Sequence, residues 1–181
     1  LIHRDIKPAN IVMRSSAEDA DPALTDFDIS KSVSPSDFGR KTTHRIGTPI
    51  YMAPELLTTS SGRPTRECDI FSLGVTFVEV YLSDCNEEKL VQLGEAAGVQ
   101  QSGDINWGEI MAAEIKRAKI DESKHPKRFE ILSLIAEMLN TDPKERPSAH
   151  DVARRAKRIA HELASYTCIN CMDQFEQAAG V

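Results

Sequence analysis

LIHRDIKPANIVM, residues 1–13, sets an acid, a lysine and an asparagine at fixed spacing, as Asp5, Lys7 and Asn10. A catalytic constellation works only when surrounding side chains support it from several directions. Only two apolar residues precede this motif in the sequence. Either the motif is coincidental, or the sequence begins inside a domain.

Composition predicts a single globular unit. The 181 residues are 40% hydrophobic and 28% charged, enough for one core and too mixed for a disordered or fibrous protein. The formal net charge of -6 offers no basic field to a phosphate backbone, so we expect no nucleic-acid partner. The most apolar run, IFSLGVTFVEVYL (residues 70–82), is too short for a bilayer and contains Glu79. It predicts a buried helix and no membrane span.

The four cysteines are too few and too unevenly spread for a disulfide scaffold. This use of cysteine favours a reducing compartment, and we expect a cytoplasmic protein. Cys168 and Cys171 have the spacing of a zinc knuckle, with His161 as a candidate third ligand. A structural zinc site needs four ligands, so a solvated tail explains the pair as well, and a zinc-dependent module stays an alternative.

Two short apolar stretches predict a small β-hairpin near the start of the sequence. NIVMR (residues 10–14) and PALTDF (residues 22–27) flank SSAEDADP, a cluster of turn-forming residues. Residues 28–61 are rich in Ser, Thr, Gly and Pro with little periodicity, which predicts a long surface loop. Long loops inside compact domains are usually functional.

Helices are expected over most of the remainder. Residues 70–82 are apolar nearly all round, which predicts a helix at the centre of the core, and Asp69 is a candidate N-cap. Residues 109–120 and 127–140 both have amphipathic helical spacing.

A last helix is predicted over residues 148–163. Ser148 and Asp151 have the spacing of a capping box at its start. The residues expected on its inner face are Val152, Ala156, Ile159 and Leu163.

Five motifs occur in one order along the sequence: HRDIKPAN, TDFD, GTPIYMAPE, DIFSLG and DPKERPSA. They span roughly residues 1 to 150 and resemble the C-terminal lobe of a eukaryotic-type protein kinase. The match is specific because several short motifs agree in their order, so no single one must carry it. The resemblance implies a mainly α fold with a small β-hairpin and a long activation loop.

The resemblance also implies a reaction, the transfer of a phosphoryl group from ATP to serine or threonine of a protein substrate, with magnesium. Such a reaction needs an aimed hydroxyl, an acceptor for its proton, and cations that neutralise the phosphate oxygens. Asp5 matches the family's catalytic acid, Lys7 the lysine that serine/threonine kinases place near the transferred phosphate, and Thr48 the threonine that hydrogen-bonds both. Asn10 and Asp26 match the two magnesium ligands, and both offer hard oxygen atoms.

Other matched residues have supporting roles. Glu55 and Arg146 match a buried ion pair of the family, and Asp69 would hold the backbone of the catalytic loop. His3 matches an architectural residue and not a general base. Arg4 matches an arginine that often clamps a phosphate on the activation loop. The candidate acceptors on that loop are Ser34, Ser36, Thr42 and Thr43.

The sequence departs from the family pattern at two places. Asp28 stands where the family has a glycine, which puts switching of the loop in question and adds a carboxylate beside the metal site. The family's glycine-rich loop and strand lysine, which precede the catalytic loop, have no counterpart in the sequence. We therefore expect residues 1–165 to be the C-terminal lobe alone, with a catalytic loop at 3–10, an activation segment at 26–55, and a tail at 166–181.

Two function classes follow from these observations. In the first, the parent protein is a serine/threonine kinase, and this chain has negligible turnover without an N-terminal lobe. In the second, the chain is a kinase-like module that binds proteins and transfers nothing. The intact Asp5, Lys7, Asn10 and Asp26 favour the first class, whereas Asp28 and the missing lobe favour the second.

Overall fold

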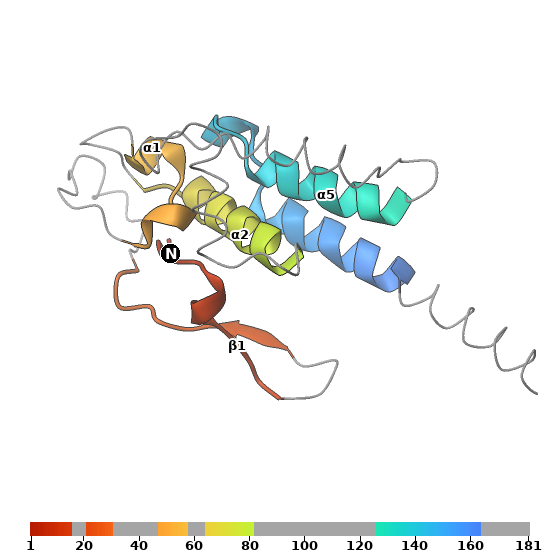
Figure 1. Cartoon of the computed structure of the whole chain (residues 1–181), viewed down its shortest axis with the longest axis horizontal. Coiled ribbons are helices and arrows are strands. Elements are labelled where there is room, and N and C mark those ends of the chain that lie inside the picture. The colour runs from red at the N-terminus through yellow and green to blue at the C-terminus, as the bar shows by residue number, and fades with distance from the viewer. Residues whose placement is uncertain (16–20, 31–46, 58–63, 82–125, 164–181) are drawn as a thin grey trace, which may run out of the picture.

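The computed structural model shows a mainly helical chain with one small β-hairpin (Figure 1), as the sequence predicts. The residues that it describes are 1–15, 21–30, 47–57, 64–81 and 126–163. Helix α2 contacts helix α5, and the helical residues 149–163 lie alongside them in the same bundle. The hairpin projects from the end of the molecule that also holds the N-terminus (Figure 1).

The predicted hairpin is confirmed. Strand β1 (Ile11–Met13) pairs antiparallel with strand β2 (Pro22–Leu24), so that Ile11 lies opposite Leu24. The proline is tolerated because it is the first residue of its strand. Beyond the strands, the backbone N–H of Thr25 donates to the carbonyl oxygen of Asn10 at 2.9 Å. The pairing thus continues to Asn10, one of the two predicted metal ligands, and to Thr25, which directly precedes the other.

Helix α2 (Arg66–Tyr81) runs through the centre of the core, as its apolar sequence predicts. Phe71, Val75 and Val78 are fully buried on it. Gly74 gives the helix its close contact with the chain just after α5, because an added Cβ would lie 3.0 Å from Leu139 Cδ2. The mid-helix glycine is therefore explained by packing.

The N-cap prediction for Asp69 is wrong, because α2 begins at Arg66 and Asp69 lies inside its first turn. The apolar run starts only at Ile70, because Arg66, Glu67 and Asp69 are polar and not buried, and Cys68 is the single buried residue before it. A pattern of buried residues therefore places the start of this helix too late.

Helix α5 (Pro126–Met138) and the helical residues 149–163 complete the described bundle. Leu132, Ile135 and Leu139 pack against α2 in the main core cluster. A second cluster joins all three helices, and its buried members are Ile70, Leu134, Met138 and Val152.

The last helix is capped as predicted, since Ser148 Oγ accepts from the backbone N–H of Asp151 at 3.1 Å. Its predicted inner face is only half right. Val152 and Ile159 are buried, whereas Ala156 is exposed and Leu163 is 41% exposed. The helix buries a narrow stripe against its neighbours, so a full amphipathic face is not needed.

Part of the predicted long loop is helical. The 3₁₀ turn η3 (Pro49–Tyr51) and the short helix α1 (Pro54–Leu57) lie within residues 28–61. Like η1 (Pro8–Asn10) and η4 (Pro143–Glu145), each begins at a proline, whose fixed φ suits the first helical position. Elements this short carry no periodicity, which is why the sequence pattern missed them.

Several predictions fall outside the described residues. They concern the amphipathic stretch 109–120, the four candidate phosphate acceptors, the Cys168 and Cys171 pair and the tail 166–181. Among the helices of the described ranges, none has the length and apolar character needed to cross a bilayer.

Candidate active site

Residues 3–10 form a loop whose backbone is held from the core. Both carboxylate oxygens of Asp69 accept backbone N–H groups of this loop, from His3 at 2.7 Å and from Arg4 at 2.9 Å. Arg4 has a φ of 72°, a left-handed conformation that costs a non-glycine residue roughly 1 kcal/mol or more. The two charge-assisted hydrogen bonds offset this strain, and the expectation that Asp69 holds the loop is met.

The ring of His3 lies between the loop and the hairpin and contacts the backbone of both. Its Nε2 lies 2.9 Å from the carbonyl oxygen of Thr25, and its Nδ1 lies 3.4 Å from the backbone N–H of Asp5. The Phe27 ring packs edge-on against it, with ring centroids 4.8 Å apart. Because both nitrogens have backbone partners, the geometry fits an architectural residue.

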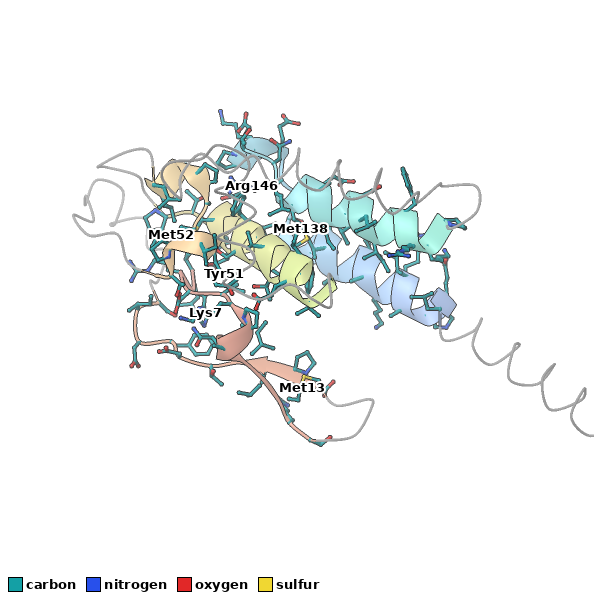
Figure 2. All side chains as sticks on the ribbon, viewed as in Figure 1. Lys7, Met13, Tyr51, Met52, Met138 and Arg146 are labelled. Atoms are coloured by element: carbon teal, nitrogen blue, oxygen red, sulfur yellow. The ribbon has the colours of Figure 1, made fainter. Side chains whose placement is uncertain are left out.

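Asp5, Lys7 and Thr48 meet in one triangle of contacts, although Thr48 is 43 residues from Asp5 in sequence. The Thr48 hydroxyl donates to Asp5 Oδ1 at 2.8 Å and accepts from Lys7 Nζ at 2.7 Å. Lys7 Nζ also lies 3.0 Å from Asp5 Oδ2, and the Thr48 backbone N–H donates to Asp5 Oδ1 at 2.9 Å. Figure 2 shows Lys7 on the side of the loop that faces η3. The three predicted residues are thus together, and their catalytic roles stay predictions.

The surroundings of Asp5 favour its ionised form. Burial alone would raise the pKa of Asp5, but the hydrogen bonds from Thr48 and Lys7 outweigh it and leave the pKa below its usual value. The carboxylate is therefore charged at neutral pH, and its two oxygens are already oriented.

The predicted metal ligands lie at the same end of the hairpin. Asn10 is buried, and its Nδ2 donates to the backbone oxygen of Asp5 at 2.8 Å and to Asp5 Oδ2 at 3.0 Å. This orientation leaves Asn10 Oδ1 as the group for a metal. Asp26 is exposed, has a φ of 61°, and directly follows Thr25, whose N–H donates to Asn10.

These two residues fit magnesium, since a carboxylate and an amide oxygen are the hard ligands that it prefers. Within the described ranges, no three His, Cys, Asp or Glu side chains converge on one point. The role of Asn10 and Asp26 as metal ligands stays a prediction.

The backbone at Asp28 does not need the positive φ that glycine would allow. The Ser30 backbone N–H donates to the Phe27 carbonyl oxygen at 3.0 Å, which makes Asp28 the second residue of a turn. Asp28 does not have a positive φ. In this conformation, the departure from the family pattern causes no backbone strain.

Arg4 is hydrogen-bonded to the segment that follows the hairpin. Its Nη2 donates to the carbonyl oxygen of Ile29, and its buried Nε has no hydrogen-bond partner among the described residues. The candidate phosphate acceptors lie outside the described ranges, so the clamp stays a prediction.

The predicted ion pair of Glu55 and Arg146 is present. Arg146 Nη1 and Nη2 each lie 2.8 Å from one carboxylate oxygen of Glu55, and the guanidinium stacks 4.9 Å from the Phe71 ring centroid. Figure 2 shows Arg146 between η4 and the start of α2. The pair attaches α1 to the helical bundle.

Two features near the site were missed by the sequence analysis. Gly47 has a φ of 117°, and a Cβ there would lie 2.5 Å from the carbonyl oxygen of Arg4. The Tyr51 hydroxyl donates to Glu79 Oε2 at 2.6 Å. The glycine directly before Thr48 was a usable signal, whereas no local pattern reveals the contact between Tyr51 and Glu79.

Comparison with known proteins relates this geometry to a family. The family model for the protein kinase domain matches residues 1–156. A leucine-rich repeat receptor-like serine/threonine/tyrosine-protein kinase of Arabidopsis thaliana is 27% identical over 162 residues, which are 89% of this chain and 24% of that protein.

Further relatives agree. A serine/threonine-protein kinase of Streptomyces coelicolor is 28% identical over 90% of this chain and 26% of its own length. Calcium-dependent protein kinase 24 of Oryza sativa subsp. japonica is 32% identical over 84% of this chain and 26% of its own length. The chain therefore spans about a quarter of the length of these curated relatives.

Proposed function

This chain belongs to the protein kinase domain family, and we propose that the protein containing it transfers a phosphoryl group from ATP to serine and threonine of protein substrates. The names of its relatives support this acceptor class. The observation that carries the proposal is the triangle of Asp5, Lys7 and Thr48, since it joins an oriented carboxylate to a cation through one hydroxyl.

Each member of the triangle has a proposed role. The Asp5 carboxylate orients the substrate hydroxyl and accepts its proton. Lys7 places a positive charge where the transferred phosphate carries negative charge. Thr48 fixes both side chains by donating to one and accepting from the other. Positioning and charge stabilisation are the main contributions that a protein makes to phosphoryl transfer.

Magnesium is the proposed metal, and Asn10 Oδ1 with the Asp26 carboxylate would hold it. When bound, the ion neutralises negative charge on the phosphate oxygens of ATP. The chain's own contribution is to fix the Asn10 amide through its two hydrogen bonds to Asp5, which also separates the metal-binding oxygen from the reacting carboxylate.

The domain assignment is also a proposal. We assign residues 1–165 to the C-terminal lobe, with the activation segment at 26–55 and a tail at 166–181. The sequence has no glycine-rich loop followed by a strand lysine, so we expect the 181 residues alone to turn over negligibly without an N-terminal lobe. A cytoplasmic location is proposed from cysteine use; Cys68, the cysteine within the described ranges, is a free buried thiol.

The test is a phosphorylation assay on the full-length protein, with radiolabelled ATP, magnesium and a mixed serine/threonine peptide library. Asp5→Asn should lower the rate by about a hundredfold or more, because a general base typically contributes that much. Asp142→Asn is the matched control, since Asp142 is an exposed aspartate that caps η4 and asparagine caps equally well. Equal rates in the two variants would contradict the proposal.

The alternative is a kinase-like module that binds proteins without catalysis. Asp28 favours it, because a second carboxylate close to Asp26 adds negative charge where phosphates would bind. Titration of the full-length protein with magnesium and ATP separates the two functions. Absence of both nucleotide binding and phosphorylation would support the module.

A further inference from the structure

Two buried hydroxyl groups lie on the central helix α2, those of Ser72 and Thr76. A buried hydroxyl needs a hydrogen-bond partner, and inside a helix this is often the carbonyl oxygen four residues earlier. Thr76 follows this rule, because its hydroxyl donates to the carbonyl oxygen of Ser72 at 2.9 Å. Ser72 has the same option at Cys68, at 3.1 Å, but its hydroxyl lies closer to the carbonyl oxygen of Tyr51, at 2.8 Å. The Ser72 hydroxyl therefore reaches a segment outside its own helix.

The Ser72 hydroxyl carries one hydrogen atom, so it donates to one of these two oxygens at a time. The shorter distance favours the oxygen of Tyr51. Tyr51 is the last residue of η3 and is buried. The hydrogen bond therefore attaches η3 to the core helix.

Tyr51 contacts α2 at a second point. Its hydroxyl donates to Glu79 Oε2 at 2.6 Å. Ser72 and Glu79 are seven residues apart, which is about two helical turns, so they lie on the same face of α2. The backbone and the ring of Tyr51 are thus both attached to this face, and η3 has a defined orientation on the helix.

The turn η3 links this face to the triangle of Asp5, Lys7 and Thr48. The Tyr51 backbone N–H donates to the carbonyl oxygen of Thr48 at 3.0 Å, and Thr48 gives both its N–H and its hydroxyl to Asp5 Oδ1. Asp69 holds the loop that carries Asp5, and it lies three residues before Ser72 on the same helix. Helix α2 therefore holds both sides of the contact between Asp5 and Thr48.

We propose that Ser72 is a positioning residue for phosphoryl transfer, because its hydroxyl holds η3 on α2 and thereby fixes Thr48 against Asp5. In the part of the chain that the structure describes, Ser72 makes no hydrogen bond to Asp5 or Thr48, so it acts through the turn. Catalysis by alignment is sensitive to small misplacements of the reacting groups. This inference rests on the proposed function and adds to it a residue outside the triangle.

The first test compares Ser72→Ala with Thr76→Val in the full-length protein, by phosphorylation of the peptide library with radiolabelled ATP. Each variant removes one buried hydroxyl from the same helix. Ser72→Ala should lower kcat about five- to tenfold, the effect of one lost hydrogen bond, and change the KM for ATP by less than about twofold. Thr76→Val is the matched control and should leave both constants within about twofold of the wild type.

A double variant tests whether Ser72 acts through Thr48. Thr48→Val already removes the hydroxyl that Ser72 is proposed to position, so adding Ser72→Ala should lower kcat by a further twofold at most, roughly. Two residues that act independently would instead multiply their effects. Full multiplication, or a kcat of Ser72→Ala equal to that of the wild type, would overturn the proposal.

The second test does not depend on activity. Amide hydrogen exchange of the full-length protein is followed by mass spectrometry of a peptide covering residues 47–52, which contains the N–H groups of Thr48 and Tyr51. Ser72→Ala should speed exchange of this peptide at least about fivefold and leave α5 unchanged, whereas Thr76→Val should not affect the peptide. An equal increase in both variants, or an increase throughout the core, would overturn the positioning role.

The two tests separate this inference from the proposed function. If the wild type phosphorylates no peptide but Ser72→Ala speeds exchange, the proposed function is wrong and the hold of Ser72 on Thr48 is supported. An active wild type with no effect of Ser72→Ala in either assay overturns the inference alone. Ser72→Cys, which keeps a weak donor, replaces the alanine variant if circular dichroism shows that variant to be unfolded, and it should show the same changes to a smaller extent.

Discussion

Replacing Arg146 with methionine should strongly destabilise the chain, because its guanidinium has many partners. The side chain is fully buried, at 0% exposure, and both terminal nitrogens donate to Glu55. It also donates to the carbonyl oxygens of Asn140 at 2.7 Å and Glu67 at 3.0 Å. A longer hydrogen bond, 3.4 Å, goes to the carbonyl oxygen of Thr141, so Arg146→Met leaves one carboxylate and three carbonyl groups without these donors.

The expected loss in free energy of unfolding is about 3–5 kcal/mol, the usual range when one partner of a buried ion pair is removed. Glu55 keeps 24% exposure, so water can solvate part of its carboxylate, which favours the lower end of that range. Methionine fills much of the space of the arginine stem, so a cavity adds little.

The assay is urea unfolding of the 181-residue chain, followed by far-ultraviolet circular dichroism. Arg154→Met is the control, since Arg154 is 64% exposed with one pair at 3.3 Å, and we expect a change within about 0.5 kcal/mol. Removing the Glu55 carboxylate as well, in Glu55→Leu/Arg146→Met, should recover part of the stability. The reasoning is refuted if Arg146→Met costs less than about 1 kcal/mol, or no more than Arg154→Met.

Three further predictions concern the triangle and its neighbour. Gly47→Ala should lower the free energy of unfolding by about 1–3 kcal/mol in the same urea assay, because its φ is 117° and the new Cβ would lie 2.5 Å from a backbone oxygen of Arg4; an unchanged midpoint contradicts this. The pKa of Asp5 is lower in the folded chain than its ordinary value of 3.8. Its ionised form therefore stabilises the fold at pH values above 3.8, and this stabilisation is lost as the pH falls through the folded pKa. The stability difference between wild type and Asp5→Asn should therefore shrink on acidification below that value, and a constant difference argues against it. In the full-length protein, Thr48→Val should lower the phosphorylation rate about 10- to 100-fold, because the hydroxyl that joins Asp5 to Lys7 is lost. Thr48→Ser keeps a hydroxyl and should keep most of the activity. Equal rates in the valine and serine variants would show that the hydroxyl is dispensable.

Local sequence patterns predicted the hairpin and α2, because turn-forming residues and an apolar run within each segment determine these elements. The hairpin follows from two apolar stretches around a turn cluster, and α2 from its apolar run. The start of α2 was misplaced because Arg66 to Asp69 precede the apolar run, and the prolines that begin η3 and α1 were read as loop residues. Short elements of this kind depend on tertiary contacts and carry no period to detect.

The candidate site was reached by a different route. The meeting of Asp5 and Thr48 could not be derived from spacing, since the two are 43 residues apart, and only the family resemblance suggested it. Asp69 shows the same limit, because its place in the sequence suggested a cap while its carboxylate in fact serves another segment. Contacts between distant segments need either a family pattern or a structure.

Because Asp69 fixes the backbone of residues 3–10, that loop depends on a residue that is synthesised later. The loop leaves the ribosome first, but the carboxylate that fixes His3 follows 66 residues later. At a synthesis rate of about 5–20 residues per second, Asp69 is added roughly 3 to 13 s after the loop. Until α2 has been made and has folded, the left-handed backbone at Arg4 has no support from that carboxylate. The backbone of residues 3–10 can therefore be held in place only after the core helix that carries Asp69 has formed.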